Sequence, residues 1–395
     1  MPTNVLIAGG GPAALEAALA LSRLAGDRVT TTLLAPELNL TYRPLSVLSP
    51  FAAGGAPTYP LKRIATDAGF EHFRGRLARV DATAREVVTT EGERLAYDML
   101  LMASGARPVE PFKTATMFTG SPTDQERLHG IVQDVEEGYL KRLAFVVPSG
   151  STWPLPLYEL ALMLAERAYE MCATLEVHVV TPETAPLAIF GSKASAEVAK
   201  LLGEAGVRVH VGTDIELMTH GRIRLTATGE QIDVDRLVTL PRLEGPAIPG
   251  LPANAEGFLV TDEHGRVEGV DDVYAAGDIT AFAIKQGGIA CQQADAVAAD
   301  VARRAGAQVD AEPFKPVLRG MLLTERWARF LRHDPAAGDD VAGRALWWPP
   351  TKIAGRELAG YLEALDEETG RAPGMPVNVD IGDAGSRSVE VLHLH

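Results

Sequence analysis

The sequence contains only two cysteines, Cys172 and Cys291, which lie far apart in a chain of 395 residues. A secreted disulfide scaffold would need several pairs, so that class is excluded, and a reduced, cytoplasmic location fits best. Free cysteine is among the most often buried residue types. We therefore expect both cysteines to lie in the core.

Basic residues are also scarce, because 37 Lys and Arg stand against 52 Asp and Glu, a formal net charge of -15. Nucleic acid is excluded as a partner, since a phosphate backbone needs a basic surface. Long apolar runs are missing as well, and no membrane-spanning helix is expected. No basic leader precedes the first strand at Asn4, so we expect no signal peptide.

What remains is a well-packed globular composition, with 46% hydrophobic and 23% charged residues. The length exceeds that of one ordinary core, and two domains with an appendage are expected. Strands and helices alternate along most of the chain, which is typical of α/β proteins with parallel sheets. We place boundaries at residues 1–110, 111–244, 245–311 and 312–395. The first and third segments form one domain, the second forms another, and the fourth forms a C-terminal cap.

The first motif is the Gly-rich turn "GGGPAA" between a strand at residues 5–8 and an Ala-rich helix. Gly9, Gly11 and Ala14 occupy the G-x-G-x-x-G/A positions. Gly9 permits the tight turn, Gly11 lets the backbone approach a pyrophosphate, and Ala14 allows close helix packing. Free helix amides then face the phosphates, and the sequence predicts dinucleotide binding here.

The acid that usually follows the second strand of such a unit is displaced. Ala35 occupies its expected place, and Glu37 follows after Pro36. Two interpretations stay open: Glu37 binds a ribose, or it is a solvated loop residue.

A second strand-turn-helix unit begins near residue 142, with the turn "VVPSGSTWPLPLYELALM". It keeps Glu159 but lacks the glycines, since Pro154 and Pro156 remove backbone donors and Trp153 obstructs the phosphate position. The turn predicts that NAD(P)H does not bind in the ordinary mode. This unit is either a scaffold or a pocket for another electron donor or acceptor. We expect helices at residues 123–139, 156–172 and from about 193, and a strand at 143–147.

Three ordered motifs, "GGGPAA", "YDMLLMASGARP" and "DVYAAGD", resemble those of two-dinucleotide-domain flavoproteins of the pyridine nucleotide-disulfide oxidoreductase superfamily. The resemblance covers roughly residues 1 to 300 and implies two interleaved Rossmann-like domains and a non-covalent FAD. It implies that Asp278 binds the ribityl chain and that the next helix points its N-terminus at the flavin. Negative charge grows there on reduction, and a helix N-terminus or a cation stabilises it. The implied cofactor contacts are Gly9, Gly11, Pro12, Ala13, Ala14, Glu37, Arg43, Pro44, Val80, Ser104, Gly105, Gly277, Asp278, Lys285, Gln286 and Gly287. For Lys285, a solvated loop lysine is the open alternative.

The segment "LNLTYRPLSV" is similar to the sulfide:quinone oxidoreductase and type II NADH dehydrogenase branch, in which an aromatic-x-Pro turn passes the flavin ring. Tyr42, Arg43 and Pro44 are the candidates. The C-terminal "RALWWPPTKIAGRELAGYLEAL" resembles the tail of the same branch. There Trp347, Trp348 and Lys352 either cover the flavin, line a quinone pocket or form a structural cap. The redox cysteines of the superfamily are absent, which argues against sulfide oxidation.

The sequence therefore predicts an FAD-dependent oxidoreductase that passes electrons from an unidentified donor to a quinone or another small acceptor. Alternatives are an NAD(P)H-dependent flavoprotein reductase and an FAD-binding module without turnover. The catalytic candidates are Lys285, Lys352 and Tyr42, and no metal is expected. His393 and His395 in the terminal "LHLH" fit an alternating strand end better than a metal site.

The expected partners are small molecules and a second copy of the chain. The basic, apolar segment "FKPVLRGMLLTERWARFLRHD" presents either a surface for peripheral membrane or subunit contact, or a solvated helix face.

Overall fold

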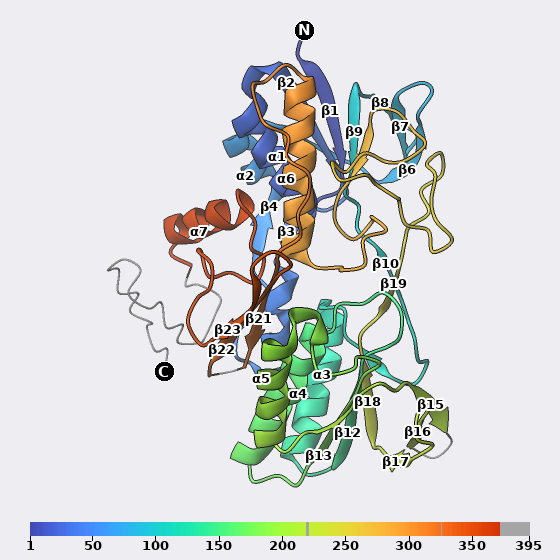
Figure 1. Ribbon diagram of the computed structural model, residues 1–395, viewed down its shortest axis with the longest axis vertical. Coiled ribbons are helices and arrows are strands. Elements are labelled where there is room, and N and C mark those ends of the chain that lie inside the picture. The colour runs from blue at the N-terminus through green and yellow to red at the C-terminus, as the bar shows by residue number, and fades with distance from the viewer. Residues whose placement is uncertain (219–220, 325, 372–395) are drawn as a thin grey trace.

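A computed structural model describes residues 1–218, 221–324 and 326–371 of the chain. Two sheet-and-helix units lie at opposite ends of the long axis, and the C-terminal elements lie along one side of them (Figure 1). Strands β10 (Arg107–Val109) and β19 (Arg242–Glu244) pair antiparallel where the chain passes between the units. The predicted α/β class with parallel sheets is confirmed.

The first unit is built on a five-stranded parallel sheet with the order β20-β9-β1-β2-β5. Strand β20 comes from far along the chain, so the unit is completed by a late segment. The strands are β1 (Thr3–Ala8), β2 (Val29–Ala35), β5 (Glu71–Arg74), β9 (Met99–Met102) and β20 (Val273–Ala275). Strand β9, "MLLM", is buried along its whole length, as expected for a strand covered on both faces.

Helices α1 (Pro12–Ala25) and α6 (Gly287–Arg304) pack against each other along their lengths. Their contact faces are rich in alanine, which lets the two helix backbones approach closely. Helix α2 (Leu61–Ala68) follows the short hairpin of β3 (Asn39–Thr41) and β4 (Thr58–Pro60). The antiparallel sheet of β6 (Leu77–Asp81), β7 (Glu86–Thr89) and β8 (Arg94–Ala96) completes the unit.

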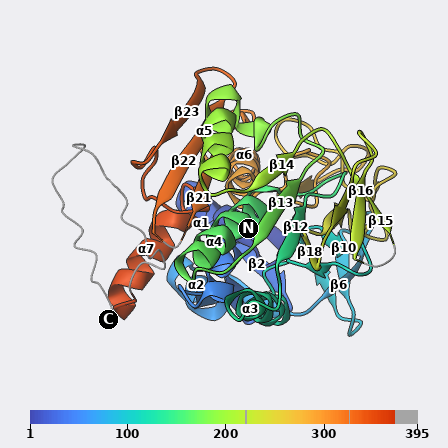
Figure 2. The ribbon, with the colours of Figure 1, turned by 90° about the horizontal axis from the view of Figure 1, so that it is seen from below.

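The second unit has a five-stranded parallel sheet with the order β11-β18-β12-β13-β14. Its strands are β11 (Thr116–Met117), β12 (Arg142–Val146), β13 (Glu176–Val180), β14 (Arg208–His210) and β18 (Arg236–Thr239). Helices α3 (Pro122–Glu136), α4 (Leu155–Glu170) and α5 (Ser192–Glu204) lie on one side of it, and β15 (Ile215–Met218), β16 (Arg222–Leu225) and β17 (Gln231–Asp233) lie on the other (Figure 2). The three predicted helices are confirmed, with ends shifted by a few residues.

The C-terminal region joins the two units. Strands β21 (Leu318–Leu323), β22 (Ala328–Asp334) and β23 (Gly338–Ala342) form an antiparallel sheet that contacts α4 and α5. A long loop then leads to α7 (Leu358–Thr369), which packs beside α1. The solvated helix face considered for residues 314–334 is wrong, because this segment is a hairpin. Its arginines alternate with buried residues along strands, and Arg319 pairs in register with Arg332.

Cys172 is a second correction, since its side chain is exposed rather than buried. Helix α4 ends at Glu170, and Cys172 falls in the following turn with a φ of 53°. Cys291 is buried in α6, as expected. In the described ranges, no helix is both long and apolar enough to cross a membrane. His393 and His395 lie outside the described residues.

Candidate cofactor site

The turn between β1 and α1 has the shape that its glycines predict. Gly9 has a φ of +140°, and a Cβ atom there would lie 2.2 Å from the carbonyl oxygen of Ala103. A side chain at this position would therefore collide with the end of β9. The N–H of Gly9 donates to the carbonyl of Leu34 at 2.9 Å, which fixes the turn against β2.

The first turn of α1 leaves room and donors for a phosphate. A Cβ atom at Gly11 would meet nothing within 4 Å. Gly11 is the N-cap residue, it supplies no side-chain cap, and Pro12 opens the helix. The N–H groups of Ala13 and Ala14 donate to no residue in the described ranges. Unpartnered amides beside open space at a helix N-terminus fit a pyrophosphate.

Asp278 lies where the second half of the site begins. Gly277, with a φ of +82°, sits between α1 and α6, since its Cβ would lie 3.2 Å from Cβ of Ala13. The carboxylate of Asp278 accepts no hydrogen bond from the described part of the chain, although Lys285 and Arg43 are close enough to act on its charge. Burial raises the pKa of Asp278, and the two cations oppose that rise. An unpartnered carboxylate beside the fingerprint helix fits a ligand hydroxyl.

Lys285 is buried, with 3% of its surface exposed, so the solvated-loop alternative is wrong. Its ammonium lies 3.7 Å from the centroid of the Phe258 ring and donates to the carbonyl of Thr280. Burial lowers the pKa of Lys285 to about 8, and the nearby Asp278 limits the decrease. Lys285 is thus held in the segment before α6, and its charge acts on Asp278 without a hydrogen bond between the two side chains.

The N-terminus of α6 is capped by Gln286, whose side-chain oxygen accepts the N–H of Ile289 at 2.8 Å. The amide of Gln286 donates to the carbonyl of Arg319 at 3.1 Å, so this side chain is fully engaged within the protein. The N–H groups of Gly287 and Gly288 find no acceptor among the residues that the structure describes. A Cβ at Gly287 would lie 2.9 Å from the Ile353 side chain, so the C-terminal loop presses on this turn.

Tyr42 and Lys352 meet at that loop. The hydroxyl of Tyr42 accepts the N–H of Ile353 at 2.8 Å. The ammonium of Lys352 lies 2.6 Å and 2.8 Å from the two carboxylate oxygens of Glu159 on α4. Burial raises the pKa of Glu159 and lowers that of Lys352. The opposite charge and the hydrogen bonds of the partner oppose both shifts, because they stabilise the charged form of each group. The loop is thus tied to both units.

The remaining predicted residues are placed as follows. The N–H of Ser104 would lie 3.0 Å from a Cβ at Gly9, so the second motif borders the first. Gly105 has a φ of +76° and faces open space. A carboxylate oxygen of Glu37 would lie 3.5 Å from a Cβ at Gly10, close to the turn. Val80 is buried, and its N–H donates to the carbonyl of Pro249.

Arg43 and Pro44 open the 3-10 helix at Arg43–Phe51, directly after Tyr42. They follow a residue that contacts the C-terminal loop, and Arg43 is near Asp278. Arg43 is therefore brought close to Asp278, which lies far along the chain and is also near Lys285.

The turn of the second unit is filled by its own contacts. The hydroxyl of Ser149 donates to the carboxylate of Asp214, and Thr152 donates to the carbonyl of Pro241. The Trp153 ring packs edge-on against Phe190, with 5.8 Å between centroids. Pro154 is the N-cap of α4 and provides no side-chain cap. This turn differs from the turn at Gly9–Ala14, because two prolines at the start of α4 carry no N–H, a Cβ atom at Gly150 would lie 3.0 Å from the Arg242 side chain, and Trp153 packs against Phe190.

The acid after β13 is also engaged. Glu183 lies where a ribose-binding acid is found in a dinucleotide unit. Its carboxylate instead accepts the Tyr158 hydroxyl at 2.6 Å and the Thr181 hydroxyl at 3.0 Å. Burial raises the pKa of Glu183, and these hydrogen bonds limit the rise. Glu183 was not among the residues predicted from the sequence, although an acid soon after the second strand of the unit was the available signal.

A buried acid pair, Glu16 and Asp295, was also missed. Glu16, on α1, accepts the N–H groups of Glu357 and Leu358, both at 2.8 Å, and so holds the start of α7. Burial raises the pKa of Glu16, and burial together with Glu16 raises the pKa of Asp295 to about 8. Cys291 is their neighbour, and burial raises the pKa of its thiol well above the usual value. The signal in the sequence was one charged residue within the apolar stretch of α1.

Residues 3–296 match the family model described as pyridine nucleotide-disulphide oxidoreductase. A protein named NADH dehydrogenase-like protein, from Mycobacterium tuberculosis (strain CDC 1551 / Oshkosh), is 27% identical over 298 residues, which cover 71% of this chain and 73% of the relative.

Solved structures resemble the whole fold. The sulfide:quinone oxidoreductase of Aquifex aeolicus superposes with a TM-score of 0.75 at 17% identity, covering 95% of this chain and 92% of that chain. The ferredoxin reductase for the CYP199A2 system of Rhodopseudomonas palustris has a TM-score of 0.63 at 22% identity, covering 86% of this chain and 84% of that one. At these identities the likeness concerns the fold.

Proposed function

The chain belongs to the pyridine nucleotide-disulphide oxidoreductase family and is an FAD-dependent oxidoreductase; from that premise we propose that it passes electrons from a donor other than NAD(P)H to a quinone or another small acceptor. The expectation of FAD from the three sequence motifs is confirmed. The finer assignment of donor and acceptor is the proposal.

The contrast between the two helix N-termini carries this proposal. At α1, open space beside Gly11 and the free N–H groups of Ala13 and Ala14 fit one dinucleotide. At α4, Pro154 and Pro156 supply no N–H, and Trp153 is packed on Phe190. The acid suited to a second ribose is bonded to Tyr158. A second dinucleotide bound in the usual way would therefore lack the two N–H groups that the prolines remove, and its ribose would compete with Tyr158 for Glu183.

FAD supplies the redox chemistry, because its ring accepts and releases electrons. The residues of the chain bind and orient it. In the proposal, the amides of Ala13 and Ala14 hold the pyrophosphate and Asp278 accepts a hydrogen bond from the ribityl chain. The N-terminal end of α6, with the free N–H groups of Gly287 and Gly288, favours negative charge on the ring.

The C-terminal loop has a further part in this proposal. The Tyr42 hydroxyl holds the N–H of Ile353, and Ile353 presses on Gly287 at the start of α6. The loop would thus exclude water from the ring side of the site. Excluding water strengthens the electrostatic effect of the helix N-terminus, because the local dielectric falls.

A second candidate is an NAD(P)H-dependent flavoprotein reductase. It is favoured by the name of the Mycobacterium tuberculosis relative, NADH dehydrogenase-like protein. In that case a nicotinamide nucleotide would bind the second unit weakly, in a mode that does not use the α4 N-terminus.

An anaerobic titration distinguishes the two candidates. The purified yellow protein is titrated with NADH, NADPH and a short-chain quinol while the flavin absorbance is followed. Dithionite-reduced protein is then mixed with a short-chain quinone. We expect rapid reoxidation by the quinone and no bleaching by micromolar NADH or NADPH. Bleaching by micromolar NADH would establish the second candidate, and failure of the quinone to reoxidise the flavin would remove the proposed acceptor.

The proposal also includes a homodimer in the cytoplasm with peripheral membrane contact. The scarcity of cysteine supports the compartment, and the basic, apolar sequence of residues 314–334 supports the contact with anionic lipid. Light scattering after size exclusion measures the assembly, and flotation with anionic vesicles measures membrane binding. A monomeric mass, or protein that stays at the bottom of the gradient, contradicts the respective part.

A further inference from the structure

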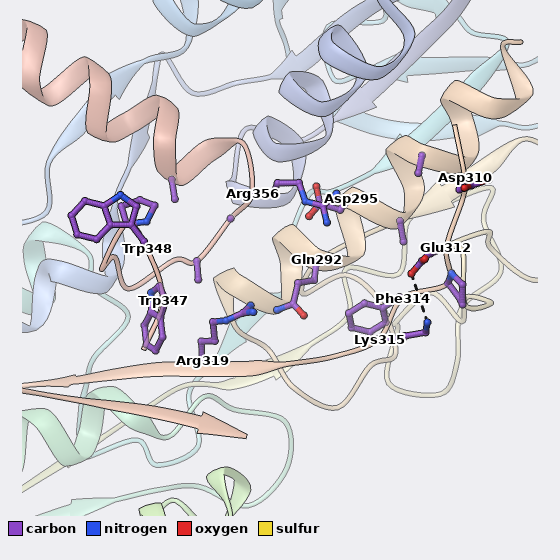
Figure 3. Close-up of a pocket in the computed structure, with 17 residues that line it drawn as sticks. Gln292, Asp295, Asp310, Glu312, Phe314, Lys315, Arg319, Trp347, Trp348 and Arg356 are labelled. Carbon is purple, nitrogen blue, oxygen red and sulfur yellow. Dashed lines mark ion pairs between the residues drawn. The ribbon is translucent and has the colours of Figure 1, made fainter. Parts of the chain in front are cut away.

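A cavity of about 670 Å³ lies on the outer face of α6, away from the Gly9–Ala14 turn (Figure 3). Its walls come from the segment after α6, from the start of β21, and from the loop that leads to α7. No residue of the fingerprint turn lines it. Its lining includes Gln292, Asp295, Arg319, Trp347, Trp348 and Arg356.

Arg319 reaches this cavity from β21. Its guanidinium forms no ion pair and no hydrogen bond with the residues in the described ranges, although its carbonyl accepts the amide of Gln286. The neighbouring Arg332 is already paired with Asp334 at 2.7 Å. Burial and the charge of Arg332 lower the pKa of Arg319. A half-buried guanidinium without a partner is unfavourable, and an anion in the cavity would supply the missing acceptor.

Arg356 borders the same cavity from the loop before α7. It forms no ion pair within the described part of the chain, and in Figure 3 it lies next to Asp295, while Arg319 lies beside Gln292. Gln292 is occupied, because its amide and carbonyl bond to Gly288 and Val317. Two guanidinium groups thus lie near one stretch of α6, and neither forms a hydrogen bond or ion pair with the residues that the structure describes.

Three acids, Asp295, Asp310 and Glu312, also line the cavity. Burial and the neighbouring Glu16 raise the pKa of Asp295 to about 8, which makes Asp295 a weaker partner for Arg356 than an ordinary carboxylate. Glu312 lies 3.7 Å from the ammonium of Lys315. Asp310 is exposed. Arg319 and Arg356 are therefore the basic groups of this cavity that form no ion pair with a described residue.

The aromatic part of the lining limits the choice of anion. Trp347 is fixed, because its N–H donates to the carbonyl of Thr351 and its ring packs edge-on against Phe330 at 4.9 Å. The adjacent Trp348 is 63% exposed. An indole is usually buried at least in part, and this one offers a flat apolar surface in the lining of the same cavity.

We propose that this cavity binds a small aromatic carboxylate, with its carboxylate between Arg319 and Arg356 and its ring against Trp348. Guanidinium groups bind carboxylates through paired hydrogen bonds, and arginine and tryptophan both stack on planar rings. The site is separate from the proposed FAD site and does not depend on the identity of the electron donor or acceptor.

Calorimetric titration of the FAD-loaded protein with naphthoate tests the proposal, with acetate and naphthalenemethanol as probes that each lack one half of the ligand. We expect one saturable site for naphthoate and weaker binding of both other probes. Arg319→Gln and Arg356→Gln should each weaken naphthoate binding about tenfold or more, since each removes a charged hydrogen bond.

Arg236→Gln, at an exposed position on β18, is the matched control and should leave the affinity unchanged. Trp348→Ala removes an exposed side chain and should weaken naphthoate but not acetate. Retained flavin absorbance shows that each variant is folded. The proposal is overturned by absence of saturable binding, by acetate binding as tightly as naphthoate, or by equal affinities of the wild type and both arginine variants.

Discussion

The ammonium of Lys352 lies 2.6 Å and 2.8 Å from the two carboxylate oxygens of Glu159, although the residues are 193 positions apart. Both side chains are buried, with no more than 6% of either residue exposed. The same carboxylate accepts the N–H of Leu323 at 2.7 Å. One ion pair therefore connects the second unit, the C-terminal sheet and the loop that covers the start of α6.

Removal of one partner of this pair should be strongly destabilising. Lys352→Met leaves the Glu159 carboxylate buried without a cation, and we expect a loss of about 3–5 kcal/mol in the free energy of unfolding. The double variant Glu159→Leu with Lys352→Met should recover most of that loss, since no charge stays buried. Chemical denaturation measures both values. A single variant as stable as the wild type would show that the pair does not hold the loop.

Two glycine substitutions should separate folding from FAD binding. Gly11→Ala adds a Cβ that meets no protein atom within 4 Å, and its φ of -89° suits alanine. We expect unchanged thermal stability of the apoprotein and a loss of bound FAD, because the methyl group enters the space proposed for the pyrophosphate. Flavin absorbance per protein measures the loss.

Gly9→Ala is the contrasting variant, since its Cβ would lie 2.2 Å from the Ala103 carbonyl. It should reduce apoprotein stability as well as FAD content. Full FAD content in Gly11→Ala would contradict the proposed pyrophosphate position.

Asp278→Ala should weaken FAD binding about tenfold, because a charged acceptor for a ribityl hydroxyl is lost. Asp278→Asn keeps an acceptor oxygen and should weaken binding less. Asp271→Ala, at an exposed position nearby in sequence, is the control. The dissociation constant is measured by reconstitution of the apoprotein. Equal FAD dissociation constants for the wild type and Asp278→Ala would argue against the contact between Asp278 and the ribityl chain.

Protein stability should decrease as pH rises because of Asp295. Its pKa is 3.8 in the unfolded reference and about 8 in the fold, where Glu16, Arg356 and Glu357 face it. The folded state holds the Asp295 proton more tightly than the unfolded state does. The protonated acid therefore contributes its full stabilisation below pH 3.8, and that stabilisation is lost as the pH rises through about 8. The expected slope is about 1.4 kcal/mol per pH unit for one proton.

Asp295→Asn removes this titration. The free energy of unfolding of the variant should therefore decline less between pH 3.8 and about pH 8 than that of the wild type. Asp310 is exposed and lines the same 670 Å³ cavity as Asp295. The variant Asp310→Asn should therefore keep the wild-type dependence of stability on pH. Denaturation midpoints across the pH range provide the comparison. Parallel profiles for the wild type and Asp295→Asn would refute the assignment of the proton to this acid.

The cofactor motifs were readable from the sequence because they are local. Gly9, Gly11 and Ala14 act within one strand-turn-helix segment, and the prolines after residue 148 are visible in the same way in the second turn. The hairpin of β21 and β22 was not readable. Its arginine spacing also fits one face of a helix, and only pairing of Arg319 with Arg332 and packing on α4 select strands.

The sequence by itself determined the α/β class, the family, the FAD and the replacement of glycine by proline and tryptophan in the second turn, since each depends on neighbouring residues. Tertiary structure decided which distant side chains meet. It paired Tyr158 with Glu183, Lys352 with Glu159 and Glu16 with Asp295, and it left Arg319 without a partner beside Trp348. Such contacts depend on how distant segments pack, and burial in that packing shifts their proton affinities.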